Sequence, residues 1–115
     1  MAEKFKKTLL IDLDGVLNTY TGNFDKNYIP EIKAGAFEFL QNLSNDYEIK
    51  LFTTRNKLIA AKWIFANKLE NFISDITSEK QLAWLYIDDR SITFNGNFKD
   101  LKNSIDNFNV WYKKI

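Results

Sequence analysis

Two aspartates separated by one residue follow a short apolar run near the start of the chain. The run Leu9-Leu10-Ile11 leads into Asp12, and Asp14 and Gly15 come directly after Leu13. In a strand, residues i and i+2 lie on the same side, so both carboxylates can converge beyond the carboxyl end of this strand. Two anions held this close repel each other unless a cation or a proton lies between them. The pair therefore indicates a hard divalent metal with oxygen ligands, and a carboxylate nucleophile beside a carboxylate acid or base.

Polar side chains also follow two later apolar runs. One run ends at Thr53-Thr54-Arg55 and another at Asp88-Asp89-Arg90, and Lys80 lies shortly before the second of these. The carboxyl ends of parallel strands share one edge of a sheet, where open α/β folds bind their ligands. We therefore expect one crevice to contain Asp12, Asp14, Gly15, Thr53, Thr54, Arg55, Lys80, Asp88 and Asp89.

Missing residue types narrow the chemistry further. The 115 residues include no cysteine and no histidine, which excludes thiolate and imidazole catalysis and leaves acid–base work to Asp, Glu, Lys or Tyr. The net charge of +1 gives no electrostatic reason to expect nucleic acid or an anionic membrane as a partner. Without an apolar run of bilayer length or a signal peptide, the chain is expected to be cytoplasmic.

Strand and helix patterns alternate along the chain. We expect strands over 7–13, 48–53, 72–76, 83–87 and 91–94, helices over 31–42, 58–69 and 98–108, and a loop over 18–30. This alternation predicts one domain, residues 1–115, built as a doubly wound, mainly parallel Rossmann-like sheet with helices on both faces, in three layers. Helical spacing predicts that Leu101, Ile105 and Phe108 face inward, and the aromatics Trp63, Phe65 and Trp84 are expected in the core.

Together these motifs resemble those of the haloacid dehalogenase-like superfamily, in its phosphatase branch. The resemblance runs from Leu9 to Arg90 and is carried by four motifs in the right order, namely Asp12-Leu13-Asp14-Gly15-Val16-Leu17, Thr53, Lys80 and Asp88-Asp89. It implies that Asp12 forms an aspartyl-phosphate and that Asp14 acts as the general acid and base. It further implies that Thr53 hydrogen-bonds the phosphoryl group and that Lys80 offsets its charge.

The resemblance also implies a magnesium site. Asp12, Asp14 through its backbone carbonyl, and Asp89 would hold Mg²⁺, with Asp88 more distant from the ion. Gly15, Thr54 and Arg55 would contribute to substrate binding. For Arg55 and Arg90, pairing with nearby carboxylates is an equally good interpretation of the sequence.

The segments 18–30 and 70–79 are too short for the cap domain of larger superfamily members, and Gln81 stands where the family often has proline. The sequence thus resembles the small, cap-less members, whose open site admits a small phosphate ester, such as a phosphosugar or a nucleotide-type phosphate, or a larger phosphorylated substrate. A neighbouring subunit in a homo-oligomer could also close the site. The alternative to an enzyme is a phosphate-binding or regulatory module with little turnover, although binding alone does not require an acid–base residue such as Asp14.

Overall fold

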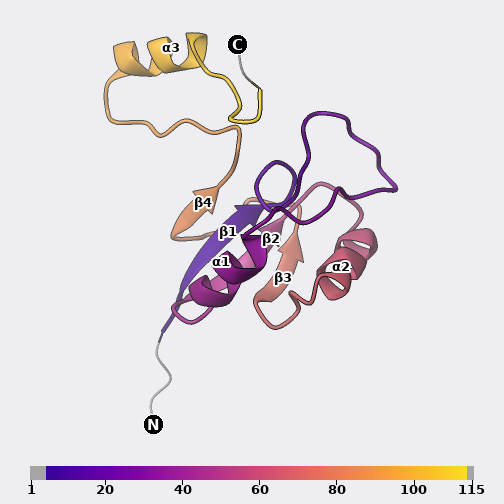
Figure 1. The fold of residues 1–115 in the computed structure, drawn as a ribbon. Helices are drawn as coiled ribbons and strands as arrows, with labels where there is room; N and C mark the ends of the chain where they lie inside the picture. The colour runs from indigo at the N-terminus through magenta and orange to yellow at the C-terminus, as the bar shows by residue number, and fades with distance from the viewer. Residues whose placement is uncertain (1–4, 114–115) are drawn as a thin grey trace.

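Four parallel strands form the centre of the molecule. The computed structural model describes residues 5–113, and its sheet has the strand order β3-β2-β1-β4. The strands are β1 (Lys7–Asp12), β2 (Tyr47–Phe52), β3 (Ile73–Thr77) and β4 (Leu85–Ile87). All three pairings are parallel, so the carboxyl ends of the strands share one edge, at the top of Figure 1.

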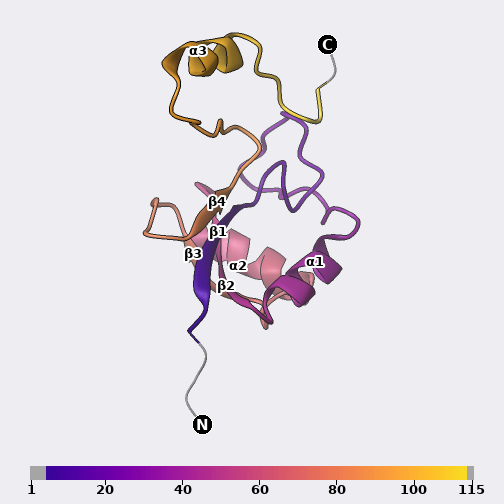
Figure 2. The same cartoon turned by 90° about the vertical axis from the view of Figure 1, so that its left-hand side faces the viewer.

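Two helices cover the same face of this sheet. Helix α1 (Ala36–Leu43) joins β1 to β2, and α2 (Lys57–Ala66) joins β2 to β3. Both connections step across the sheet in the same direction, so right-handed crossovers place both helices on one side, as Figure 2 shows. The core lies between this face and the helices, and its fully buried members include Ile11, Leu13, Leu40, Ile49 and Leu51.

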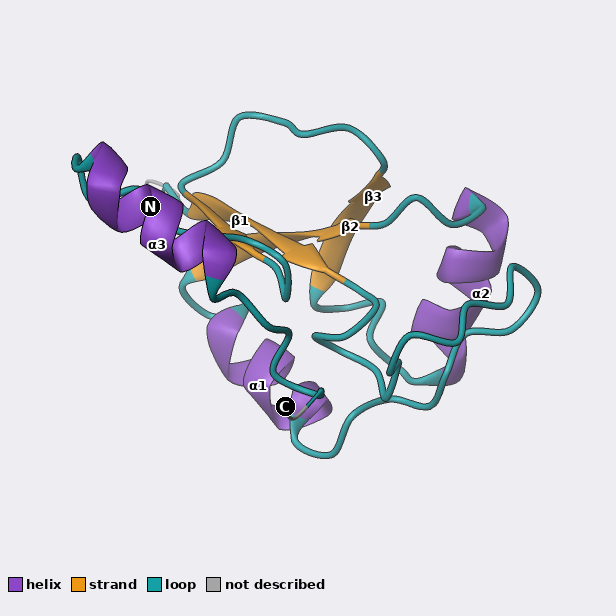
Figure 3. Cartoon of the chain, turned by 90° about the horizontal axis from the view of Figure 1, so that it is seen from above, coloured by secondary structure: helices purple, strands orange, loops and turns teal. Residues whose placement is uncertain are grey.

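The prediction of helices on both faces, in three layers, is wrong. The opposite face is crossed by the irregular segment 78–84, which runs above the sheet in Figure 3. This segment returns the chain from β3 to β4 and is too short to contain a packed helix. It is fastened by Gln81, whose Oε1 accepts a hydrogen bond from Lys50 Nζ (3.1 Å) and whose backbone oxygen accepts one from Tyr86 Oη (2.7 Å).

Several element boundaries also differ from the prediction. Residues 91–94 form no strand, and the first helix begins at Ala36 because Ile32 pairs with Asn18 in an antiparallel bridge. Helix α2 begins where the Asn56 side chain accepts hydrogen bonds from the backbone N–H groups of Leu58 and Ile59. Among the three aromatics expected in the core, Trp63 is buried, whereas Phe65 and Trp84 are exposed.

Helix α3 (Phe98–Asp106) lies away from the sheet, beyond its carboxyl edge, in both Figure 1 and Figure 2. None of its residues is buried, and Ile105 and Phe108, predicted to face inward, are 55% and 42% exposed. The radius of gyration is 15.6 Å, compared with about 13 Å for a compact chain of this length. Within the described residues, no helix is long and apolar enough to cross a membrane.

Candidate active site

Three carboxylates meet at the carboxyl edge of the two strands β1 and β4. Asp12 is the last residue of β1, and Asp88 and Asp89 directly follow β4. These strands are hydrogen-bonded neighbours, so their ends lie side by side. One carboxylate oxygen from each of Asp12, Asp88 and Asp89 lies within 4.8 Å of the other two. We call these three residues the acidic cluster.

The acidic cluster is electrostatically strained in the absence of a cation. Burial, followed by the charges of Asp88, Asp89 and Asp14, raises the pKa of Asp12 from 3.8 to about 8. Burial and a hydrogen bond with Asp88 also raise the pKa of Asp89. A bound proton or a cation would relieve this repulsion. Oxygen ligands from a few carboxylates fit the preference of Mg²⁺.

Gly15 allows the acidic cluster to pack against the first turn. Its φ is +84°, and a Cβ at this position would lie 2.3 Å from Asp89 Oδ2 and 3.2 Å from the Tyr112 ring. Only glycine combines this backbone conformation with such a close neighbour. Gly15 therefore lies against a carboxylate and an aromatic ring, and its part in substrate binding stays a prediction.

Asp14 faces a different environment from Asp12. One of its oxygens, Oδ2, accepts a hydrogen bond from Arg55 Nε (2.9 Å), and the other, Oδ1, accepts one from Asn18 Nδ2 (3.0 Å). Its carboxylate is therefore not part of the acidic cluster, and both of its oxygens have fixed donors. The two nearby carboxylates therefore lie in distinct environments.

Asn18 was missed by sequence reasoning, which placed it in a polar loop. It is fully buried, and its Oδ1 accepts hydrogen bonds from the backbone N–H groups of Gly15 (3.2 Å) and Tyr20 (3.1 Å). It thus fixes the turn after β1 while its amide donates to Asp14. The only signal in the sequence is its position four residues after Asp14, which by itself is not specific.

The end of β2 supplies a buried hydroxyl. Thr53 is 4% exposed, and its Oγ1 accepts a hydrogen bond from the backbone N–H of Arg55 (3.1 Å). Its own N–H donates to the Thr77 carbonyl at the end of β3 (2.9 Å). Thr54 is exposed beside it, and Thr53, Thr54 and Arg55 all line a surface depression that does not include Asp12.

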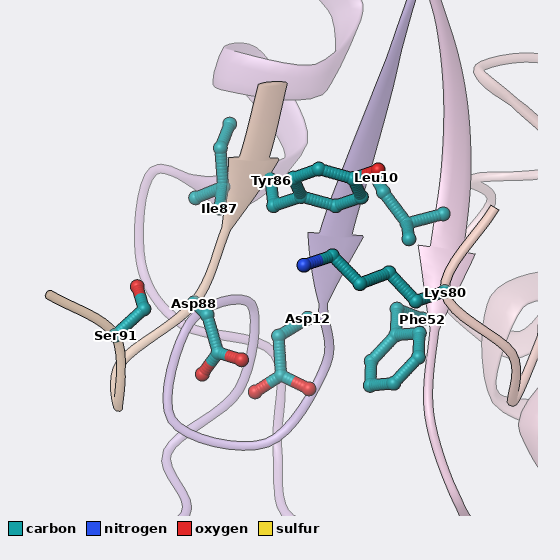
Figure 4. Close-up of a pocket in the computed structure, with 8 residues that line it drawn as sticks. All are labelled: Leu10, Asp12, Phe52, Lys80, Tyr86, Ile87, Asp88 and Ser91. Atoms are coloured by element: carbon teal, nitrogen blue, oxygen red, sulfur yellow. The ribbon is translucent and has the colours of Figure 1, made fainter. Parts of the chain in front are cut away.

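A pocket of about 190 Å³ opens on the side of the acidic cluster that faces segment 78–84. Figure 4 shows the Lys80 side chain reaching across this pocket, with the carboxylates of Asp12 and Asp88 beside each other below it. The ammonium of Lys80 lies 4.7 Å from the centre of the Tyr86 ring. The pocket is smaller than the roughly 300–1,000 Å³ of sites for drug-sized ligands, and its size suits a small anionic group.

The two arginines of the predicted crevice differ in burial. The side chain of Arg55 is 1% exposed and is paired with Asp14, whereas Arg90 is exposed and its backbone N–H donates to Asp88 Oδ1 (3.0 Å). The nitrogen Nη2 of Arg55 is buried and has no acceptor among the described residues.

Comparisons with known proteins support the fold and give no information on an activity. No protein-family model matches the chain, and no curated protein matches it. Its structure is similar to that of a conserved protein coded by a locus from Bacteroides thetaiotaomicron, with a TM-score of 0.60 and 19% sequence identity. The similarity covers 89% of this chain and 91% of that one. At this identity the likeness establishes a shared α/β fold with a parallel, Rossmann-like sheet.

Proposed function

We propose that this protein is a magnesium-dependent phosphatase that hydrolyses a phosphate monoester through an aspartyl-phosphate intermediate. One observation carries the proposal. The acidic cluster contains a carboxylate, Asp12, beside a pocket crossed by Lys80, while the neighbouring Asp14 is kept out of the cluster by Arg55 and Asn18. A nucleophile, a separate acid–base residue and a cation are the groups that such a reaction requires.

In the first step, an oxygen of Asp12 attacks the phosphorus atom and the bond to the leaving-group oxygen breaks. Asp14 enters this step protonated and gives its proton to that oxygen, so the alcohol leaves neutral. In the second step, Asp14 takes a proton from a water molecule, whose oxygen attacks the phosphorus of the aspartyl-phosphate. Inorganic phosphate leaves and the carboxylate of Asp12 is restored.

Other residues of the site bind and orient the phosphoryl group. Lys80 would offset the charge on its oxygens, and the Thr53 hydroxyl and the N–H groups near Thr54 would donate hydrogen bonds to it. Asp12, Asp89, Asp88 and the backbone carbonyl of Asp14 would hold Mg²⁺. Bound Mg²⁺ supplies positive charge that keeps the acidic cluster ionised and neutralises phosphoryl oxygens.

The substrate class follows from the shape of the site. The pocket beside Asp12 has room for a phosphoryl group and little more, and no separate domain covers the carboxyl edge of the sheet among the described residues. The rest of the substrate would therefore extend toward solvent. A phosphosugar, a nucleotide-type phosphate or a phosphorylated macromolecule all meet this condition.

The test is release of inorganic phosphate from 4-nitrophenyl phosphate, with Mg²⁺ and with a chelator. We expect magnesium-dependent turnover by the wild type, and a loss of at least about 10³-fold in Asp12→Asn, because the amide is not a nucleophile. Lys62→Met, at an exposed position on α2, is the control and should keep wild-type activity.

Two results would contradict the proposal. Turnover that survives Asp12→Asn would exclude the aspartyl-phosphate, and full activity in the chelator would exclude the metal. A folded wild type that binds Mg²⁺ and phosphate but hydrolyses no ester would instead support a phosphate-binding or regulatory module.

A further inference from the structure

The loop after β1 extends beyond the carboxyl edge of the sheet and is fastened at two levels. At its base, Thr19 N–H donates to the Glu31 carbonyl (2.9 Å), and Trp63 Nε1 on α2 donates to the Pro30 carbonyl (3.1 Å). Its outer part, residues 24–28, is exposed and lies over the same edge of the sheet in Figure 1 and Figure 2. We call residues 24–28 the outer turn.

Arg55 joins the outer turn to the rest of the molecule. Its Nη1 donates to the backbone carbonyls of Asp25 (2.8 Å) and Tyr28 (3.2 Å), and its guanidinium lies 4.5 Å from the centre of the Phe24 ring. The hydrogen bonds within the turn, from Tyr28 N–H to the Asp25 carbonyl and from Asn27 N–H to Asp25 Oδ1, fix its shape but do not attach it to anything.

The same guanidinium holds Asp14 through Nε. A guanidinium is planar and rigid, so the positions of its three nitrogens are not independent. Displacing the outer turn would therefore move or tilt the donor to Asp14. Because the side chain is almost fully buried, solvent screens these contacts little and the arrangement has few alternatives.

We infer that Arg55 is a positioning residue that couples the outer turn to Asp14, so that the geometry of the acid–base carboxylate depends on that turn. The role of Asp14 as the acid–base residue rests on the proposed function. The coupling between the outer turn and the Asp14 side chain does not depend on it. Lysine cannot replace arginine here, since a single ammonium cannot reach Asp14 and both carbonyls with a fixed geometry.

The catalytic test compares phenyl phosphate with 4-nitrophenyl phosphate, which have similar shapes but different leaving groups. Phenolate is the poorer leaving group and needs the proton from Asp14, whereas 4-nitrophenolate leaves with little assistance. In Arg55→Lys, we expect kcat/KM to fall about 10- to 100-fold for phenyl phosphate and less than about 3-fold for 4-nitrophenyl phosphate. A general loss of folded enzyme would lower both values equally.

A double-mutant cycle with Asp14→Asn assigns the effect to Asp14. In the Asp14→Asn background, adding Arg55→Lys should no longer change the ratio of the two kcat/KM values, because the group that Arg55 positions is gone. Equal losses on both esters in Arg55→Lys, or a ratio that changes as much without Asp14, would overturn the inference.

Hydrogen exchange tests the structural coupling without activity. In Arg55→Met, the amides of Asn27 and Tyr28 should exchange at least about 10-fold faster than in the wild type, whereas Lys62→Met should leave them unchanged. If the wild type hydrolyses neither ester, the proposed function fails. Hydrogen exchange alone then tests whether Arg55 holds the outer turn. Unchanged exchange in a folded Arg55→Met would then overturn the coupling.

Discussion

Two neighbouring carboxylates at the end of β1 have opposite surroundings, and this difference defines the site. Asp12 is partly buried beside Asp88 and Asp89, and burial with these charges raises its pKa to about 8. Asp14, two residues further on, has a hydrogen-bond donor on each oxygen. Pairs of titratable groups with such different environments are typical of sites that need a nucleophile and an acid–base residue.

The raised pKa of Asp12 predicts a pH-dependent stability in metal-free protein. Below pH 3.8 the Asp12 carboxyl is neutral in both the folded and the unfolded chain, so it does not make the free energy of unfolding depend on pH. As pH rises toward about 8, the unfolded chain releases this proton first, so the folded state becomes progressively less stable. Asp12→Asn has no such proton. Between pH 5 and 8, we expect the free energy of unfolding to decrease in the wild type by about 1–3 kcal/mol more than in Asp12→Asn. This range allows for the partial exposure of Asp12.

Urea unfolding in the presence of a chelator measures this difference. Adding Mg²⁺ at pH 8 should restore stability to the wild type and have a much smaller effect on Asp12→Asn, because one ligand is missing. Identical pH dependence of the two proteins would show that Asp12 ionises normally in the folded state.

The residues that meet in the site were predictable to different degrees. Asp12, Asp88 and Asp89 follow apolar runs, and parallel pairing of β1 with β4 is enough to bring them together. Asn18 was not predictable, because its role depends on the path of the turn after β1 and on its complete burial. The partner of Arg55 likewise depends on a three-dimensional contact, and sequence alone left substrate and carboxylate as equal choices.

At the scale of elements, connection lengths explain both the successes and the errors. Four of the five predicted strands exist with bounds within two residues of the prediction, since short apolar runs ended by polar groups are specific, whereas the run 91–94 forms no strand. The prediction of three layers was wrong, because the alternation of strands and helices does not reveal the direction in which each crossover connection steps across the sheet. The short return from β3 to β4 leaves segment 78–84 to cover the second face and to carry Lys80.

The attachment of segment 78–84 to β4 predicts a role for the hydroxyl of Tyr86, which lies outside the acidic cluster. Tyr86→Phe keeps the ring beneath the Lys80 ammonium but removes the 2.7 Å hydrogen bond to the Gln81 carbonyl. We expect Lys80 to be less well placed, so KM for 4-nitrophenyl phosphate should rise about 3- to 10-fold. The free energy of unfolding should change by no more than about 1 kcal/mol, because Tyr86 is 43% exposed.

Steady-state kinetics and urea unfolding measure the two effects. Tyr47→Phe is a matched control, since Tyr47 lies at the opposite, amino end of β2. An unchanged KM in Tyr86→Phe would mean that segment 78–84 holds Lys80 without this bond.

At the scale of the whole molecule, the chain consists of a packed body and a projecting C-terminal part. The body contains the sheet, α1 and α2, and the hydrophobic core lies within it. The C-terminal part returns to the body after α3, where Val110 is buried and Trp111 Nε1 donates to the Gly15 carbonyl (2.7 Å). Helix α3 therefore stands between two attachments, β4 and Trp111, that both lie next to the acidic cluster.

This division predicts an unequal response to substitutions of apolar residues. Leu40 on α1 is fully buried, so Leu40→Ala should lower the free energy of unfolding by about 2–5 kcal/mol. Ile105 on α3 is 55% exposed, so Ile105→Ser should change it by less than about 1 kcal/mol despite the helical apolar spacing. Urea unfolding of both variants measures the contrast. A loss of 2 kcal/mol or more in Ile105→Ser would mean that α3 packs against apolar surface in solution, and would contradict the projecting arrangement.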